Sequence, residues 1–208
     1  MFKRNVVIKH KKVNALNLNF KNMIFFILFF SGIIIGCFSI KNSESALIDL
    51  LKDYFISYIS EVSNKDFLVC FLNSLLIFIL PTIFIFVFGL CAVGIPIIIA
   101  TPVIIGIFSG MAISFLFFTY SLQGIGYSAL IIIPSITIII ATLLKSCEEA
   151  FIMSSEIIIN MSGYQNSKRK NELKDYCLRF LIFTIPVILS ALLNVSSQKI
   201  FSGLFSFI

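Results

Sequence analysis

Between Phe67 and Leu144 the chain contains no charged side chain. Apolar residues fill this stretch, and glycine and proline interrupt it mainly at residues 89–96 and 124–134. A helix that spans a bilayer needs about 20 mostly apolar residues, so these interruptions divide the stretch into three segments of spanning length. The sequence therefore predicts the middle of a multi-pass membrane protein.

The remainder of the chain has a similar character. Hydrophobic residues make up 59% of it and charged residues 12%, and the mean hydropathy is +1.04, which lies far from the composition of soluble globular proteins. We expect an all-α, multi-pass helical bundle that forms a single membrane domain, residues 23–208, behind a basic arm, residues 1–22. The expected spans, about five in number, are 23–40, 67–91, 95–120, 127–144 and 178–195.

The distribution of charge predicts the orientation. The arm 1–22 carries six Lys or Arg residues and no acidic residue, which places it in the cytoplasm by the positive-inside rule. Segment 145–177 is also expected in the cytoplasm, and the more acidic segment 41–66 outside, so the N-terminus lies inside and the C-terminus outside. The net charge of +6 does not indicate nucleic-acid binding, because the positive residues flank membrane segments and no base-reading motif accompanies them.

Segment 41–66 has the pattern of an amphipathic helix on the outer membrane surface. Large apolar and aromatic residues recur at helical spacing in it: Leu47, Leu51, Tyr54, Phe55, Tyr58 and Val62. Such a helix either rests its aromatic face in the membrane interface or docks a partner. Tyr54, Phe55 and Tyr58 are therefore candidate partner contacts.

The charged residues Lys145, Glu148 and Glu149 directly follow the fourth predicted span. Each would cost about 2.5 to 3.5 kcal/mol at mid-bilayer, so we expect them at the inner interface, on a helix that continues towards residue 160. Lys145 and Glu149 are four residues apart and can form an ion pair on one helix face, although this order of the two charges is the less favourable one. All three are candidate partner contacts, and residues 164–177 are expected to form a polar cytoplasmic loop.

Glycine and proline mark the expected packing and turn positions. Gly32 and Gly36 form a small-xxx-small pattern that allows a second helix to approach closely. The other positions assigned to helix packing or turns are Gly89, Gly94, Pro96, Gly106, Gly110 and Pro134. A tight inner turn is expected at 89–96, and a short outer turn at Gln123, Gly124 and Gly126.

Chemistry-bearing motifs are scarce. The one histidine, His10, lies in the basic arm, and the five cysteines show no C-x-x-C spacing. The dipeptide Glu148-Glu149 is similar to the glutamate pair of CAAX-type membrane proteases, but Met153 stands where that pattern has arginine. We therefore expect no catalytic residue, no metal site and no cofactor. A small membrane transporter or channel subunit is the alternative function, because proline-broken helices can expose backbone groups to a solute.

The glycine and proline pattern resembles that of the stage II sporulation protein M family. The residues that carry the resemblance are Phe88-Gly89-Leu90-Cys91-Ala92-Val93-Gly94-Ile95-Pro96, Gly106-x-x-x-Gly110, Gly124-x-Gly126 and Leu130-Ile131-Ile132-Ile133-Pro134. Chain length, the basic arm and the five-span plan are similar as well.

The resemblance implies a helical membrane protein of the bacterial cell membrane, located at the sporulation septum, with no catalytic activity of its own. It implies a scaffold that works with a peptidoglycan hydrolase and a second septal membrane protein, in contact with membrane lipids. Together these partners would thin the septal wall and drive engulfment of the forespore. The family supplies no catalytic residues to transfer to this chain.

Overall fold

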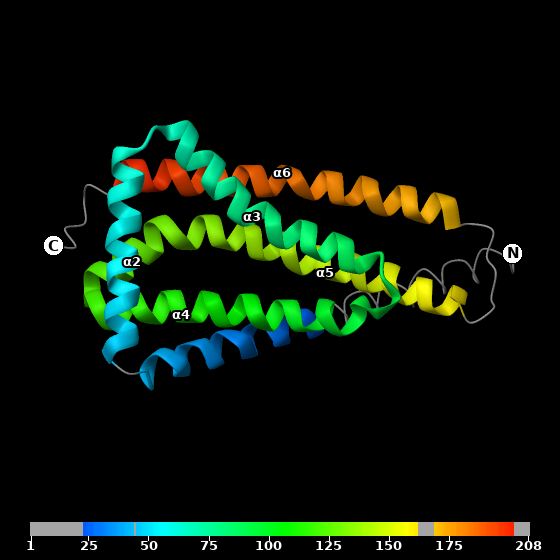
Figure 1. The fold of residues 1–208 in the computed structure, drawn as a ribbon, viewed down its shortest axis with the longest axis horizontal. Coiled ribbons are helices and arrows are strands. Elements are labelled where there is room, and N and C mark those ends of the chain that lie inside the picture. Colours follow the sequence, from blue (N-terminus) through cyan, green and yellow to red (C-terminus); the bar gives the residue numbers. More distant parts are fainter. Residues whose placement is uncertain (1–22, 44, 162–168, 202–208) are drawn as a thin grey trace, which may run out of the picture.

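The computed structural model describes residues 23–43, 45–161 and 169–201 (Figure 1). Long helices run side by side in this part of the chain, and one shorter helix lies crosswise over one end of them. No strand occurs in the described residues. The all-α membrane bundle predicted from composition is therefore confirmed. The basic arm 1–22 lies outside the described residues, and so does Gly163, at which the sequence predicts a helix end.

The N-terminal helix, Met23–Lys41, ends where the uncharged segment meets Lys41. Helix α2, Ser45–Asn64, follows and crosses the end of the bundle (Figure 1). We call this the outer end, because the charge pattern predicts that it faces away from the cytoplasm. The crosswise direction fits the amphipathic pattern of α2, since a helix with one apolar face lies on a surface rather than through a bilayer.

Helix α3, Phe67–Gly89, returns to the opposite, inner end. A single 3-10 turn, Ala92–Gly94, connects it to α4, Ile95–Tyr127. Pro96 lies in the first turn of α4, where a missing N–H costs nothing because that group would have no helical acceptor. The tight turn predicted at residues 89–96 is thus present, and we call it the inner joint.

The chain reverses direction at Ser121, which has a φ of 49°. The turn predicted at Gln123, Gly124 and Gly126 was placed slightly too late, because these residues already belong to the next helical segment. Gly124 permits the reversal: a β-carbon there would collide with the carbonyl oxygen of Leu116.

A π-helical turn, Ser128–Ile132, precedes α5, Ile133–Met161. Pro134 accounts for the wider turn, because it has no N–H and its ring crowds the carbonyl four residues earlier. The span predicted at residues 127–144 is therefore the outer part of a much longer helix.

Helix α6, Arg169–Phe201, completes the bundle. The polar loop predicted at 164–177 is wrong from Arg169 onward, because those residues form the first turns of α6. The predicted span 178–195 lies inside α6. The apolar residues from Ser196 onward predict a tail in the outer interface, but residues 196–201 continue the same helix. The other apolar residues of this predicted tail, Leu204, Phe205 and Ile208, lie outside the described residues.

Four helical segments in the described residues are long and apolar enough to cross a membrane: Met23–Lys41, Phe67–Gly89, Ala92–Ile158 and Leu173–Phe201. The third folds back on itself at Ser121, so that α4 and α5 run in opposite directions (Figure 1). Each of its two arms, α4 with 33 residues and α5 with 29, is long enough to cross by itself, which agrees with the five spans that the sequence predicts. Large apolar residues such as Leu80, Leu181 and Ile185 are 64%, 64% and 66% exposed, as expected for a surface that faces lipid.

Candidate partner-binding surfaces

The N-terminal helix and α4 are in contact through two pairs of glycines. A β-carbon on Gly32 would collide with the Val103 carbonyl oxygen, and one on Gly106 with that of Phe29. Gly36 and Gly110 make the same kind of approach one turn further along, to Ile107 and Ile33. These positions hold the two backbones at a distance that only glycine permits.

The inner joint is attached to α5 and α6 by two hydrogen bonds. Tyr176 donates its hydroxyl to the Phe86 carbonyl at 3.0 Å, and Ser154 donates to the Cys91 carbonyl at 2.7 Å. The Phe86 carbonyl is one of the last four carbonyls of α3, and these receive no hydrogen bond from an N–H of their own helix. Gly89 lies against Ala150 and the Tyr176 hydroxyl, so a side chain there would displace the contact.

At Gly94 the constraint that requires glycine comes from the backbone of the preceding turn and not from a neighbouring helix. A β-carbon at this position would collide with the Phe88 carbonyl oxygen within the joint itself. Pro96 is exposed, and so is Pro134. Both prolines shape the backbone of their own segment and do not pack into the core.

The charged residues of α5 do not pair as predicted. Lys145 binds Glu148 at 2.9 Å, not Glu149, and Glu149 instead binds Arg179 on α6. The expected Lys145–Glu149 pair is therefore wrong. The spacing argument considered one helix alone, whereas Arg179 reaches Glu149 from a neighbouring helix. Lys145 pairs with Glu148 instead, three residues further along α5.

Glu148 is buried in the bundle, with 2% of its surface exposed. Its Oε2 accepts the hydrogen bond from Lys145, while its Oε1 has no hydrogen-bond partner among the described residues. Glu149 borders a cavity of about 110 Å³ between α5 and α6 that is also lined by Glu156, Asp175 and Arg179. Of the three candidate partner contacts on α5, Lys145 and Glu149 reach the surface and Glu148 does not.

The outer candidates separate into packed and free side chains. Phe55 lies over a buried cluster beneath α2, with ring centroids 6.0 Å from Phe115 and 5.4 Å from Tyr127. Tyr58 accepts a hydrogen bond from Gln198 at 2.9 Å. Tyr54, by contrast, is 75% exposed, and Leu50 one turn earlier is 70% exposed.

A chain of side-chain amides holds α2 to the bundle. Gln198 donates to Tyr58 and to Asn194, and Asn194 donates to Ser74 of α3 at 3.3 Å. Lys199 also donates to the carbonyl of Lys65, just beyond the end of α2, at 2.6 Å. Sequence reasoning missed Asn194 and Gln198, although two amides four residues apart at the end of an apolar span were a usable signal.

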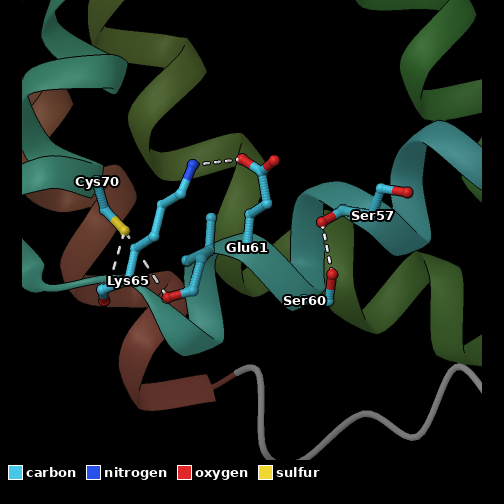
Figure 2. A network of polar contacts seen from close by, with 6 residues as sticks. Ser57, Ser60, Glu61, Lys65 and Cys70 are labelled. Carbon is cyan, nitrogen blue, oxygen red and sulfur yellow. Dashed lines mark hydrogen bonds and ion pairs between the residues drawn. The ribbon is translucent and has the colours of Figure 1, made fainter.

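Figure 2 shows the end of α2 where it meets α3. Lys65 and Glu61 form an exposed ion pair at 2.8 Å. The Cys70 thiol points towards the carbonyl oxygens of Val62 and Lys65, at 3.7 and 3.9 Å. At the turn from α2 into α3 the Cys70 thiol and the Lys199 ammonium thus both approach main-chain carbonyls, and the Lys65–Glu61 ion pair lies on the surface.

The described residues contain no group of three or more His, Cys, Asp or Glu side chains placed to hold a metal ion. The sequence profile of the family described as stage II sporulation protein M matches residues 25–194. The chain belongs to the stage II sporulation protein M family. Comparison with curated proteins and with solved structures gave no match. Membership in this family assigns the chain to the sporulation-related membrane proteins and confirms the resemblance seen in its glycine and proline pattern.

Proposed function

We propose that this chain is a non-enzymatic membrane scaffold that recruits or positions peptidoglycan-remodelling partners at the sporulation septum, for wall thinning and forespore engulfment. The observation that carries the proposal is the way α2 is held on the bundle while part of its surface stays exposed. The helix is fixed across the outer end of the bundle by Phe55, Tyr58 and Gln198, yet it leaves Leu50 and Tyr54 exposed.

This arrangement suits a docking surface. Tyrosine is one of the residue types that contribute most to the binding energy of protein interfaces. A helix that is already ordered loses little conformational freedom when a partner binds. Leu50 and Tyr54, which we call the free flank of α2, also belong to the helix at the end of the bundle that the charge pattern predicts to face the wall.

The proposal is tested in the host by replacing the gene with the Tyr54→Ala variant and, separately, by deleting it. We expect both strains to fail in engulfment and to mislocalise the peptidoglycan hydrolase, while the variant protein remains in the membrane at its normal level. Normal engulfment with correctly placed hydrolase in the deletion strain would contradict the scaffold function itself. Normal engulfment in the Tyr54→Ala strain, together with failed engulfment in the deletion strain, would show that the partner contact lies elsewhere on the chain.

A small transporter or channel subunit remains the second candidate, and Glu148 is the observation in its favour. Ionisable residues buried within membrane bundles commonly belong to ion or proton pathways. This function predicts solute or ion flux in proteoliposomes that is lost in the Glu148→Gln variant. Absence of flux across a broad panel of ions and small solutes would exclude it.

A further inference from the structure

A groove of about 340 Å³ lies between α3 and α6 on the membrane-facing surface. It is lined from Ile79 to Phe86 on α3 and from Cys177 to Thr184 on α6. Its two threonine hydroxyls are already used: Thr82 donates to the Phe78 carbonyl at 3.5 Å, and Thr184 to that of Leu181 at 2.7 Å. The groove therefore offers apolar contact and leaves neither of these hydroxyls in need of a polar partner.

The dimensions of the groove favour a thin occupant. At a rise of about 1.5 Å per residue, each wall extends for only about 10 Å along its helix. A transmembrane helix is itself about 10 to 12 Å wide and must bury a stripe along roughly 30 Å of membrane. A flexible hydrocarbon chain fits such a short groove better than a partner helix does.

A positive charge stands at the inner end of the groove. Lys174 precedes Cys177 by three residues and Leu181 by seven, so it lies on the same side of α6 as the groove. Its side chain is exposed, and no carboxylate of the described residues forms an ion pair with it. Asp175 lines the separate cavity beside Arg179 and Glu149.

We propose that the groove binds one anionic phospholipid from the leaflet on the side of the inner joint, which the charge pattern predicts to be cytoplasmic. An acyl chain occupies the groove between Ile83 and Leu181, and the headgroup phosphate binds the Lys174 ammonium. Basic residues next to pockets between transmembrane helices recognise anionic headgroups in this way. The proposal is independent of the scaffold function.

The test uses the full chain in phosphatidylcholine nanodiscs with a trace of phosphatidylglycerol that carries a photoreactive group on its acyl chain. We expect crosslinks at residues 79–86 and 177–184 to exceed those at Leu72 and Leu76 several-fold, although these two residues of α3 are 55% and 60% exposed. Unlabelled phosphatidylglycerol should remove the excess, whereas added phosphatidylcholine or inorganic phosphate should not.

Two pairs of variants identify the parts of the site. Lys174→Gln should lower the excess several-fold, and Lys52→Gln at the outer end should not. Ile83→Phe should fill the groove and lower the excess, while Leu76→Phe, on a lipid-facing position outside it, should not. The proposal would be overturned by uniform labelling of the lipid-facing surface, or by labelling of the groove that is insensitive both to the headgroup and to Lys174→Gln.

Discussion

Gly32 and Gly106 face each other across the contact between the N-terminal helix and α4. A β-carbon on Gly32 would lie 3.1 Å from the α-carbon of Gly106, and one on Gly106 would lie 3.0 Å from that of Gly32. The closeness is reciprocal, and the atoms in the way are backbone atoms, which cannot move aside as a flexible side chain can. Packing of the first span therefore depends on both residues.

Gly106→Ala should lower the free energy of unfolding by about 1 to 3 kcal/mol, the usual range for overpacking. Gly106→Leu should lower it further. Stability can be followed in detergent with a thiol-reactive fluorophore in a background that keeps Cys147 as its single cysteine. Cys147 is fully buried and becomes reactive only on unfolding, whereas Cys91 and Cys177 are exposed in the folded chain. Ala100→Leu enlarges an exposed residue of the same helix and serves as the control. Equal melting temperatures for Gly106→Ala and the unaltered chain would contradict this packing.

Tyr176→Phe tests the attachment of the inner joint. The substitution removes the hydroxyl that satisfies the Phe86 carbonyl but keeps the ring, which stacks on Phe86 with centroids 5.3 Å apart. We expect a loss of about 1 to 3 kcal/mol, since a buried acceptor remains without a donor. Tyr54→Phe, at an exposed position, should change stability by no more than about 0.5 kcal/mol. A loss of the same size in both variants would show that the hydrogen bond contributes nothing specific.

The pair formed by Lys145 and Glu148 makes an asymmetric prediction. Lys145→Met should destabilise the chain by about 1 to 3 kcal/mol, because it leaves the buried Glu148 carboxylate without its donor. The double variant Lys145→Met, Glu148→Gln should recover most of that loss, since the buried charge is removed as well. The recovery is measured by comparing the melting temperatures of both variants with that of Glu148→Gln alone. Failure of the double variant to recover would mean that Lys145 acts through contacts other than Glu148.

The sequence predicted the fold class, the spans and the inner joint because these depend on local properties: apolar length, helix-breaking residues and flanking charge. The spacing of Gly32 and Gly36 indicated a close helix approach, but it did not identify α4 as the neighbour. Partner choice depends on the three-dimensional arrangement of spans that share nearly the same composition.

Two site predictions show where local reasoning fails. The pairing of Lys145 with Glu149 overlooked Arg179, which lies thirty residues away along the chain and reaches Glu149 only once α5 and α6 pack. The reversal within α4 is centred on Ser121, a residue that carries no sequence signal for a positive φ. In the first case a contact between two helices determined the outcome.

Orientation is open to a direct check by thiol labelling of intact cells. In a cysteine-free background, a cysteine at the exposed Ser60 of α2 should react with a membrane-impermeant maleimide added outside. A chain that retains Cys91 alone, at the exposed inner joint, should react only after permeabilisation. The reverse pattern would place the N-terminus outside and invert every surface assignment made from the charge pattern.

The two neighbouring aromatic residues of α2 should respond differently to substitution. Phe55→Ala removes a ring that packs against Phe115, Tyr120 and Tyr127, and it should cost about 3 kcal/mol or more of stability. Tyr54→Ala removes an exposed ring and should leave the melting temperature nearly unchanged. If the free flank of α2 is the docking surface, Tyr54→Ala should nevertheless reduce co-purification of the septal partners from sporulating cells by about tenfold, which corresponds to about 1.4 kcal/mol of binding free energy. Lys52→Ala, on another exposed part of the same helix, is the matched control, and equal recovery of partners with both variants would show that Tyr54 is not part of the contact.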